Sequence, residues 1–447
     1  MKRYSLGLAV AAIVPLAAHA ANMSAIKAEV ARDWRQSLGP MFENFHRNPE
    51  LSFVEVKTAA RMAQELRAVS GMVVSEQVGH TGVVGVLRNG PGPTLLIRAD
   101  MDALPLKEQS GVVYASTARM VDRDGVDQPV MHACGHDTHI TSLIGTAHRL
   151  AAHRAEWSGT AIFVVQPAEE VGGGARAMLA DGLFKRFGKP DYALGFHVAA
   201  LNPTGSLIVR DGAEDSSADT VKIIVHGVGA HGASPQLGKD PIVMGAEIVM
   251  ALQTVISREI GPRNAGVITV GTFHGGIKEN IISDHADMGL TVRADDEATR
   301  QKLFQGIRQV ALGVGKMNGM PNNKLPEVFI NANEGTPPNI NDATLAARVR
   351  GDFVRAFGPG VLIDKVRDGM PGDDFAEFGR AGVPSVYFEV GGTPQAALDA
   401  AKAGGPPVAG HHSPLFKVDG EAAVILGTEA MTVAALDLLR APQTARR

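Results

Sequence analysis

Hydrophobic and polar positions follow helical and strand-like patterns in alternation along most of the chain. Apolar residues recur at helical spacing over about 24–70 and over Ile140–Ala152, which predicts helices there. Wholly apolar short runs, of which Thr160–Gln166 is the most uniform, predict strands buried on both faces of a sheet. Further strands are predicted at Val83–Leu87, Thr94–Ile97, Tyr192–His197 and Ser385–Val390. This alternation is typical of an α/β fold with a mixed, mainly parallel sheet flanked by helices.

The middle of the chain has a different order of elements. Residues about 214–330 give the order strand, helix, strand, strand, helix, with Asp240 and Pro241 at the start of the first helix. This order is that of a small two-layer α+β unit of the ferredoxin-like kind. The α/β pattern resumes afterwards. We therefore expect residues 21–213 and 331–447 to form one split domain around an inserted domain at 214–330.

The first 20 residues have the pattern of a secretory signal peptide. Lys2 and Arg3 form a basic start, Leu6–Ala18 is apolar, and Ala18–Ala20 has the small-x-small form of a cleavage site. The apolar run is shorter than the roughly 20 residues of a membrane-spanning helix. A buried N-terminal helix is the alternative. We expect cleavage near Ala20 and a soluble mature chain exported to a bacterial periplasm.

Composition narrows the classes of function. The 447 residues carry 43 Lys and Arg against 47 Asp and Glu, and 45% are hydrophobic. These ordinary globular values argue against a disordered chain and a multi-span membrane protein, and no basic surplus favours nucleic-acid binding. Cys134 is the only cysteine, so no intramolecular disulfide can form. An unpaired cysteine in an oxidising compartment needs an explanation.

The densest group of reactive side chains is the segment Met131–His139. It contains three histidines, Cys134 and one aspartate. Thiolate and imidazole are natural ligands of zinc and similar metals. One glycine separates Cys134 from His136, which allows both side chains to converge from a tight turn. A cluster that only packs against or caps the next helix is the alternative.

Further candidate ligands lie at the ends of predicted strands and in a late loop. Glu169 and Glu170 follow the apolar strand that ends at Gln166, His197 ends a strand, and His412 lies in a Gly/Pro-rich loop. Adjacent side chains on extended backbone point in opposite directions. One carboxylate of the pair would then bind metal while the other reaches a water molecule. An exposed acidic pair and structural histidines are the alternatives.

These residues supply five candidate metal ligands, which are Cys134, His136, Glu170, His197 and His412. Five exceed the three protein ligands usual for one catalytic zinc, and they suit two divalent ions if the thiolate bridges. Two ions about 3.5–4 Å apart can share one activated water. Glu169 would then be the general base that passes a proton to the leaving amine. The donors suit zinc first and also permit Mn, Co or Ni.

Nine short motifs support a family resemblance across almost the whole expected mature chain. They are Arg98–Leu106 (RADMDALPL), His132–His139 (HACGHDTH), Gln166–Glu170 (QPAEE), Gly195–His197 (GFH), Gly229–Pro235 (GAHGASP), Gly275–Asp284 (GGIKENIISD), Thr291–Arg293 (TVR), Gly372–Phe375 (GDDF) and His411–Phe416 (HHSPLF). With them the chain resembles the aminoacylase/carboxypeptidase superfamily of di-metal peptidases. It is most similar to the amidohydrolase branch that holds hippurate hydrolases and auxin-amino-acid conjugate hydrolases.

The resemblance implies roles for residues around the metals. It implies ligation by the five candidates with Cys134 as the bridge, and Glu169 as the base. His139 would not be a ligand. Asp100 stands where many superfamily members have a ligating histidine. Asp102 would orient a ligand from outside the metal sphere, as carboxylates commonly do.

The resemblance also implies a role for the inserted domain as a lid and dimerisation unit. His231 and Asn280 match residues that reach the partner subunit's site, where they stabilise the oxyanion or hold the substrate carboxylate. A turn cap is the alternative for His231. Arg293 is a candidate for carboxylate binding or for a structural ion pair. Asp373 and Asp374 replace a Glu-Asp pair that is more usual in the family.

The expected function is that of a secreted di-metal amidohydrolase, homodimeric through its lid domain. It would hydrolyse the amide of N-acyl or N-aroyl amino acids, or of dipeptide-like substrates, to a free amino acid and a carboxylic acid. Two alternatives stay open. One is a metal-independent hydrolase with Cys134 as its nucleophile. The other is a non-catalytic periplasmic protein that binds metal or peptide. No nucleic-acid or membrane partner is expected for the mature form.

Overall fold

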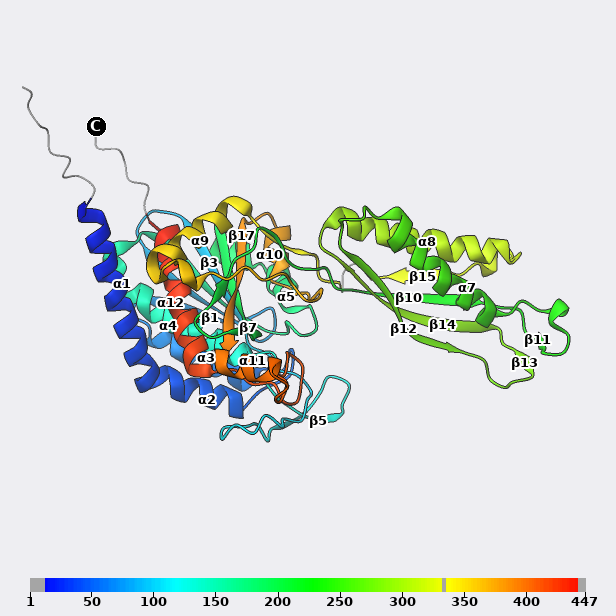
Figure 1. The fold of residues 1–447 in the computed structure, drawn as a ribbon, viewed down its shortest axis with the longest axis horizontal. Coiled ribbons are helices and arrows are strands. Elements are labelled where there is room, and N and C mark those ends of the chain that lie inside the picture. Colours follow the sequence, from blue (N-terminus) through cyan, green and yellow to red (C-terminus); the bar gives the residue numbers. More distant parts are fainter. Residues whose placement is uncertain (1–12, 332–334, 441–447) are drawn as a thin grey trace, which may run out of the picture. The chain divides into compact units, whose positions relative to one another are not determined.

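The computed structural model describes residues 13–331 and 335–440, and their elements are shown in Figure 1. Most of the predicted signal peptide, residues 1–12, lies outside this described part of the chain. The chain divides into two compact units. The first unit comprises Met1–Val209, Thr344–Lys365 and Val386–Arg447, and the second unit comprises Arg210–Ala343 and Val366–Ser385.

The first unit is built on a seven-stranded mixed sheet. Its strands, in spatial order, are β1 (Met72–Val78), β2 (Gly82–Asn89), β6 (Gly159–Gln166), β3 (Thr94–Asp100), β7 (Tyr192–Pro203), β17 (Ser385–Thr393) and β8 (Leu207–Ile208). Strands β6, β3 and β7 run parallel at its centre, whereas β1, β2 and β6 pair antiparallel. Strand β6 is almost wholly buried, because its uniform apolar run packs on both faces. The expected mixed α/β class is confirmed.

Helices surround this sheet. They are α1 (Ile13–Asp33), α2 (Gly39–Arg47), α3 (Val56–Ala68), α4 (His136–Ala152), α9 (Ala343–Phe357) and α12 (Gly420–Leu438). Of these, α3, α4 and α12 contact its strands directly. Helices α4 and α12 lie side by side, with α1 against them (Figure 1). Shorter elements are β4 (Arg119–Val121), β5 (Asp127–Pro129), α5 (Gly174–Ala180), α6 (Leu183–Phe187) and α11 (Gln395–Lys402).

The helical pattern predicted over about 24–70 is interrupted in the structure. Helix α2 ends at Arg47 and α3 begins only at Val56. Pro49 explains the break, because a proline disfavours helical backbone in the residue before it. The segment Asn48–Glu55 thus leaves the helix and runs toward the sheet, where Leu51 makes a parallel bridge to Ala103. This irregular segment contributes to the candidate metal centre described below.

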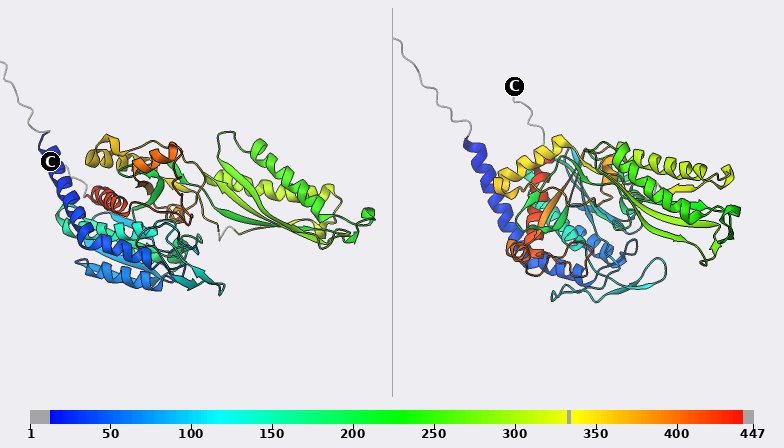
Figure 2. Two further views of the ribbon diagram at one scale, coloured as in Figure 1. Left: turned by 60° about the horizontal axis from the view of Figure 1, so that its bottom comes forward. Right: turned by 45° about the vertical axis from the view of Figure 1, so that its right-hand side comes forward.

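The second unit has the predicted ferredoxin-like order with one further strand. Strands β12 (Gly266–Gly275), β14 (His285–Ala294), β10 (Asp219–His226) and β15 (Glu327–Ile330) form an antiparallel sheet in that spatial order. Helices α7 (Pro241–Thr254) and α8 (Glu297–Met317) cover one face of it, as Figure 2 shows. The Asp240 side chain accepts from Ile242 N and Val243 N and so caps α7. Smaller elements are β9 (Gly212–Asp215), β11 (Ala230–His231), β13 (Ile281–Ile282), β16 (Asn339–Asn341) and α10 (Ala376–Arg380).

One helical stretch among the described residues, Pro241–Glu259, is long and apolar enough to cross a membrane. A third of this stretch is buried within the protein. Met244, Ile248 and Leu252 belong to the core between α7 and the sheet of the second unit. The apolar character of α7 is in part that of a core helix, so it is weak evidence for a membrane span.

Candidate metal centre

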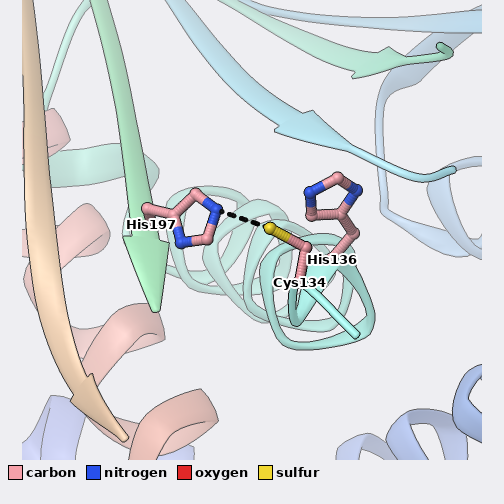
Figure 3. Close-up of side chains that lie close together, drawn as sticks. All are labelled: Cys134, His136 and His197. Atoms are coloured by element: carbon pink, nitrogen blue, oxygen red, sulfur yellow. Dashed lines mark hydrogen bonds between the residues drawn. The ribbon is translucent and has the colours of Figure 1, made fainter. Parts of the chain in front are cut away.

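Three of the candidate ligands meet at the start of α4 (Figure 3). Cys134 Sγ lies 3.4 Å from His197 Nε2, and both atoms lie within 4.8 Å of a ring nitrogen of His136. Gly135 makes this possible, because it adopts left-handed backbone with φ +87° at the N-terminus of α4. A Cβ at this position would lie 2.4 Å from Val198 Cγ1. Glycine is therefore needed to bring the thiol and the imidazole side by side.

His136 presents one free lone pair to the cluster. Its Nδ1 donates to the backbone oxygen of Asp102 at 2.8 Å, which leaves Nε2 unprotonated in the neutral ring. His136 Nε2 and Glu170 Oε1 are both buried without a hydrogen-bond partner among the described residues, and they lie 3.8 Å apart. Buried polar atoms without partners are rare in folded proteins. A shared cation would satisfy both atoms.

A second set of ligand atoms includes the same thiol. Cys134, Glu170 and His412 place ligand atoms within 4.8 Å of one another, and His412 Nε2 lies 3.3 Å from Glu170 Oε2. The His412 backbone N–H donates to Ala133 O at 2.8 Å, which ties the late loop to the turn that carries Cys134. Cys134 therefore belongs to two overlapping groups, the position that a bridging ligand requires.

These residues fit divalent cations. Metal–ligand bonds of about 2.0–2.3 Å place neighbouring ligand atoms roughly 3–4 Å apart, and the distances above lie in that range. Thiolate, imidazole and carboxylate form a donor set that zinc and related ions accept. The structure brings together all five candidate ligands, and each belongs to the first unit.

The electrostatics of the cluster favour positive charge. Burial opposes protonation of His136, but the Asp100 carboxylate and the hydrogen bond to Asp102 outweigh it and raise the His136 pKa to about 10. Burial raises the pKa of Glu170 to about 8, and the neighbouring carboxylates of Asp102 and Asp100 add to this effect. In the absence of a metal ion, protons on His136 and Glu170 thus offset the negative charge of the neighbouring carboxylates. Metal binding should therefore compete with protonation.

Glu169 lies in the same cluster, contrary to one expectation. The prediction that Glu169 and Glu170 point in opposite directions is wrong, because both place a carboxylate oxygen within 4.8 Å of the other and of His136. Strand β6 ends at Gln166, Ala168 has a positive φ of 53°, and the acidic pair lies in a turn rather than on extended backbone. Glu169 Oε2 lies 3.9 Å from His136 Nε2. A general base at the position of Glu169 would therefore be close to a metal ion held by His136.

Asp102 supports the acidic pair. Its Oδ1 accepts from Glu169 N at 3.0 Å and its Oδ2 from Glu170 N at 3.1 Å. Ser52 Oγ also donates to Oδ2 at 2.6 Å. His136 is oriented by the backbone oxygen of Asp102 at 2.8 Å, while Asp102 Oδ1 is 3.5 Å from His136 Nδ1. The carboxylate of Asp102 therefore mainly fixes the backbone that carries the two glutamates.

Asp100 and His139 are engaged with protein groups rather than placed as ligands. Asp100 Oδ1 is 2.6 Å from His139 Nδ1, and Asp100 Oδ2 accepts from Arg98 Nη1 at 2.7 Å. His139 Nε2 accepts from Val198 N at 2.9 Å, so both of its ring nitrogens are used. Burial lowers the pKa of His139 to about 4, which keeps it neutral.

Two supporting groups were not assigned from the sequence. Arg98 is buried, and besides Asp100 it donates to Gln166 Oε1 at 2.9 Å. An arginine and an aspartate within the apolar strand β3 were a detectable signal for this buried pair. The other group is Glu55 in the irregular segment before α3, for which the local pattern gave no signal.

The remaining candidates lie in the second unit. His231 is exposed on β11, its Nδ1 accepts from Ala233 N at 2.9 Å, and the next residue, Gly232, donates its N–H to Asn280 O at 2.8 Å. The turn cap uses one ring nitrogen of His231 and leaves the other for a ligand. Arg293 is partly buried on β14, and burial lowers its pKa. The structure thus brings His231 and Asn280 together, with Arg293 on a different strand.

Comparison with known proteins identifies the family to which this chain is similar. The family model described as peptidase family M20/M25/M40 matches residues 96–403. The hippurate hydrolase of Campylobacter jejuni is 39% identical over 298 residues, which cover 66% of this chain and 73% of the relative. The IAA-amino acid hydrolase ILR1-like 5 of Arabidopsis thaliana is 32% identical over 399 residues, which cover 89% and 85%.

A solved structure has a similar fold and is described as binding two metal ions. The Bacillus subtilis YXEP protein, described as a dinuclear metal binding peptidase from the M20 family, superposes with a TM-score of 0.73 at 28% identity. The superposition covers 91% of this chain and 99% of that one.

Proposed function

Since this chain belongs to peptidase family M20/M25/M40 and is a metal-dependent amidohydrolase, we propose that it cleaves N-acyl or N-aroyl amino acids, or dipeptide-like compounds. The products are a free amino acid and a carboxylic acid. One observation carries the proposal. The five candidate ligands and the Glu169 carboxylate form overlapping groups of ligand atoms, one of which is the unpartnered Nε2 of His136. The relatives described above, a hippurate hydrolase and an IAA-amino acid hydrolase, support this substrate class.

The metal ligands in this proposal are Cys134, His136, Glu170, His197 and His412, with the Cys134 thiolate shared between two divalent ions. Zinc is the first candidate, and Mn, Co and Ni suit the same donors. The bound ions would polarise the amide carbonyl and lower the pKa of the attacking water. A thiolate held between two cations is also protected from disulfide formation, which accounts for an unpaired cysteine in an exported protein.

Glu169 moves the proton in this proposal. Its carboxylate lies 3.9 Å from His136 Nε2 and stands on a turn whose backbone Asp102 holds. Glu169 takes a proton from the attacking water and delivers it to the nitrogen of the leaving amino acid, because an amide nitrogen departs only when protonated. The hydrogen bonds to Asp102 fix the base before substrate arrives.

The second unit is proposed to act as a lid and to form a homodimer. His231 would stabilise the oxyanion in the partner subunit's site, and Asn280 and Arg293 would hold the substrate carboxylate. Exposed apolar side chains on α7, among them Val243 and Met250, and the unpaired edge of β12 support an interface on this unit. Sedimentation analysis should give twice the monomer mass. A monomer with full activity would contradict both roles.

Export to the periplasm is proposed from the N-terminal sequence pattern. The described side chains of α1 that enter the core are Met23, Ile26 and Val30, all beyond the proposed cleavage after Ala20. Cleavage would therefore leave these contacts in place. Mass spectrometry of the protein expressed in a Gram-negative host should find a mature N-terminus at Ala21 in the periplasmic fraction. An intact Met1 in the cytoplasm would contradict the proposal.

The substrate proposal is tested by a panel assay on enzyme stripped of metal and reconstituted with Zn, Mn, Co or Ni. The panel contains hippurate, N-acetyl amino acids, an indole-3-acetyl amino acid and simple dipeptides. We expect metal-dependent release of the free amino acid from at least one N-acyl or N-aroyl compound. Turnover of none of them with any of the four metals would contradict the proposed substrate class.

A further inference from the structure

Three consecutive backbone N–H groups lead into the acidic pair, and two buried carboxylates accept all three. Asp102 accepts from Glu169 N and Glu170 N, as described above. The third group, Ala168 N, donates to Glu55 Oε1 at 2.9 Å. Glu55 lies 113 residues earlier in the chain, at the end of the irregular segment between α2 and α3. The turn is therefore held from two separate places.

Glu55 is itself rigidly fixed. Its side chain is wholly buried, Oε1 also accepts from Phe53 N at 2.8 Å, and Oε2 accepts from Thr81 Oγ1 at 2.5 Å. A buried carboxylate is costly unless hydrogen bonds compensate its lost hydration. Three donors from three parts of the first unit offset part of this cost here. One of these donors is the residue directly before the proposed base.

Ala168 is the residue at which this contact matters. Its φ of 53° lies in the left-handed region, which costs an L-residue about 1 kcal/mol or more relative to ordinary backbone. Left-handed backbone at a non-glycine residue persists only where its surroundings enforce it. The hydrogen bond from Ala168 N to Glu55 is such a constraint. Without it, Asp102 would still hold Glu169 N and Glu170 N, and Gly173 N and Gly174 N would still donate to Ala168 O at 3.2 Å, but the Ala168 N–H would lose the acceptor that fixes its direction.

We propose that Glu55 is a positioning residue for Glu169. By accepting the Ala168 N–H it fixes the left-handed turn that places the Glu169 carboxylate beside His136. This inference rests on the proposed role of Glu169 as the proton-transfer base. The competing explanation is that Glu55 only stabilises the fold through its bonds to Phe53 N and Thr81 Oγ1.

Three substitutions at one position separate these explanations. Glu55→Ala removes the acceptor. Glu55→Asp shortens the side chain by one methylene and so moves the carboxylate away from Ala168 N. Glu55→Gln keeps a carbonyl oxygen for Ala168 N and Phe53 N, and its amide can donate to Thr81 Oγ1. The matched control is Glu50→Ala. Glu50 is a buried glutamate of the same segment, but its Oε2 accepts from Thr58 N at the start of α3 rather than from the acidic turn.

Each variant is assayed for kcat, KM, bound metal per chain and Tm on the best substrate of the panel. We expect Glu55→Ala and Glu55→Asp to lower kcat by about 10- to 100-fold, because misplacement by about 1 Å has effects of this size. KM should change by less than about 3-fold and the metal content should stay that of the wild type. Glu55→Gln should restore kcat to within about 3-fold. Glu50→Ala should lower Tm and leave kcat unchanged.

Several results would overturn the proposal. They are a wild-type kcat in Glu55→Asp, an equal loss of kcat in Glu50→Ala, or a loss of metal that accounts for the loss of kcat. If Glu55→Ala does not fold, the comparison of Glu55→Asp with Glu55→Gln carries the test alone. Glu169→Gln is measured in parallel. If it turns over normally, the role of the base is wrong. If it is inactive while the Glu55 variants are normal, only the positioning role is wrong.

Discussion

His136 and His231 are both proposed to serve the same reaction, yet their surroundings are opposite. His136 is buried in the first unit, its Nδ1 is fixed by Asp102 O, and its Nε2 lies 3.8 Å from Glu170 Oε1 and 3.9 Å from Glu169 Oε2. His231 is exposed in the second unit and is held by one backbone N–H from Ala233. The fold of the first unit therefore builds the metal centre in advance. In the proposed function, His231 would act from an exposed surface that a substrate or a second subunit completes.

The largest effect expected from this comparison is loss of the centre itself. Removing metal with a chelator, or replacing Cys134 by Ala, should lower kcat by about 1000-fold or more, because metal ions supply several kcal/mol of transition-state stabilisation. Adding zinc should restore the chelated wild type but not the variant. Substrate turnover and metal content are measured on the same samples. Full activity after chelation, with iodoacetamide as the only effective inhibitor, would instead favour the thiol hydrolase.

A smaller effect is expected at the exposed histidine. His231→Ala should lower kcat by about 100-fold, the size of effect seen when one oxyanion donor is removed. Metal content and Tm should stay as in the wild type, since the proposed metal ligands all lie in the first unit. His226→Ala is the matched control, because His226 lies at the surface of the same unit and its ring pairs with Glu327. Equal losses in the two variants would exclude a specific role for His231.

The preformed geometry of the metal centre can be tested through its glycine. Gly135→Ala combines a positive φ with a Cβ 2.4 Å from Val198 Cγ1, so we expect a loss of about 2–4 kcal/mol in stability and weaker zinc retention. Gly125 has a similar φ of +82° but open space around the Cβ position. Gly125→Ala should therefore lose only about 1–2 kcal/mol and retain zinc. Calorimetry and dialysis against a chelator distinguish the two, and equal zinc retention would contradict a preformed turn.

The smallest expected effect is a pH dependence of the free energy of unfolding that arises from His46, a buried histidine near the metal centre. His46 lies between Asp137, at 2.7 Å, and Glu108, at 3.0 Å. Burial opposes its charge, but the hydrogen bonds to these carboxylates raise its pKa to about 9 from 6.5. The resulting stability is fully present below pH 6.5 and is lost as pH rises through about 9. The free energy of unfolding should fall over this window by up to about 3 kcal/mol. A His46→Gln variant should lack this decline. An equal decline in the variant would contradict the assignment.

The clustering of the candidate metal ligands was largely predictable from the sequence, whereas the residues that support the cluster were not. Cys134, His136, Glu170, His197 and His412 belong to ligand-capable residue types in compact motifs, so residue chemistry alone singled them out. The predicted direction of the Glu169 side chain was wrong, because the pattern of apolar residues does not indicate the left-handed φ of Ala168. Glu55 was missed because its contact with Ala168 spans 113 residues and arises only when the sheet forms.

The fold likewise has parts that the sequence predicts and parts that it does not. The ferredoxin-like order of the second unit followed from regular alternation, as in the buried and exposed positions of β10. The break between α2 and α3 was missed because the segments on both sides of Asn48–Glu55 have helical apolar spacing. Local pattern predicts elements well where each element is regular. It fails where an irregular segment serves a distant site.

The most direct test of the account is the metal content and turnover of Glu169→Gln measured in one sample. The substitution keeps the size of the side chain and removes its capacity to hold the proton. The account predicts the same metal per chain as the wild type, with kcat lower by about 100- to 10,000-fold, the range for general acid–base catalysis. Near-normal turnover with full metal would contradict the assignment of the base. Loss of metal in step with activity would make Glu169 a ligand rather than the residue that moves the proton.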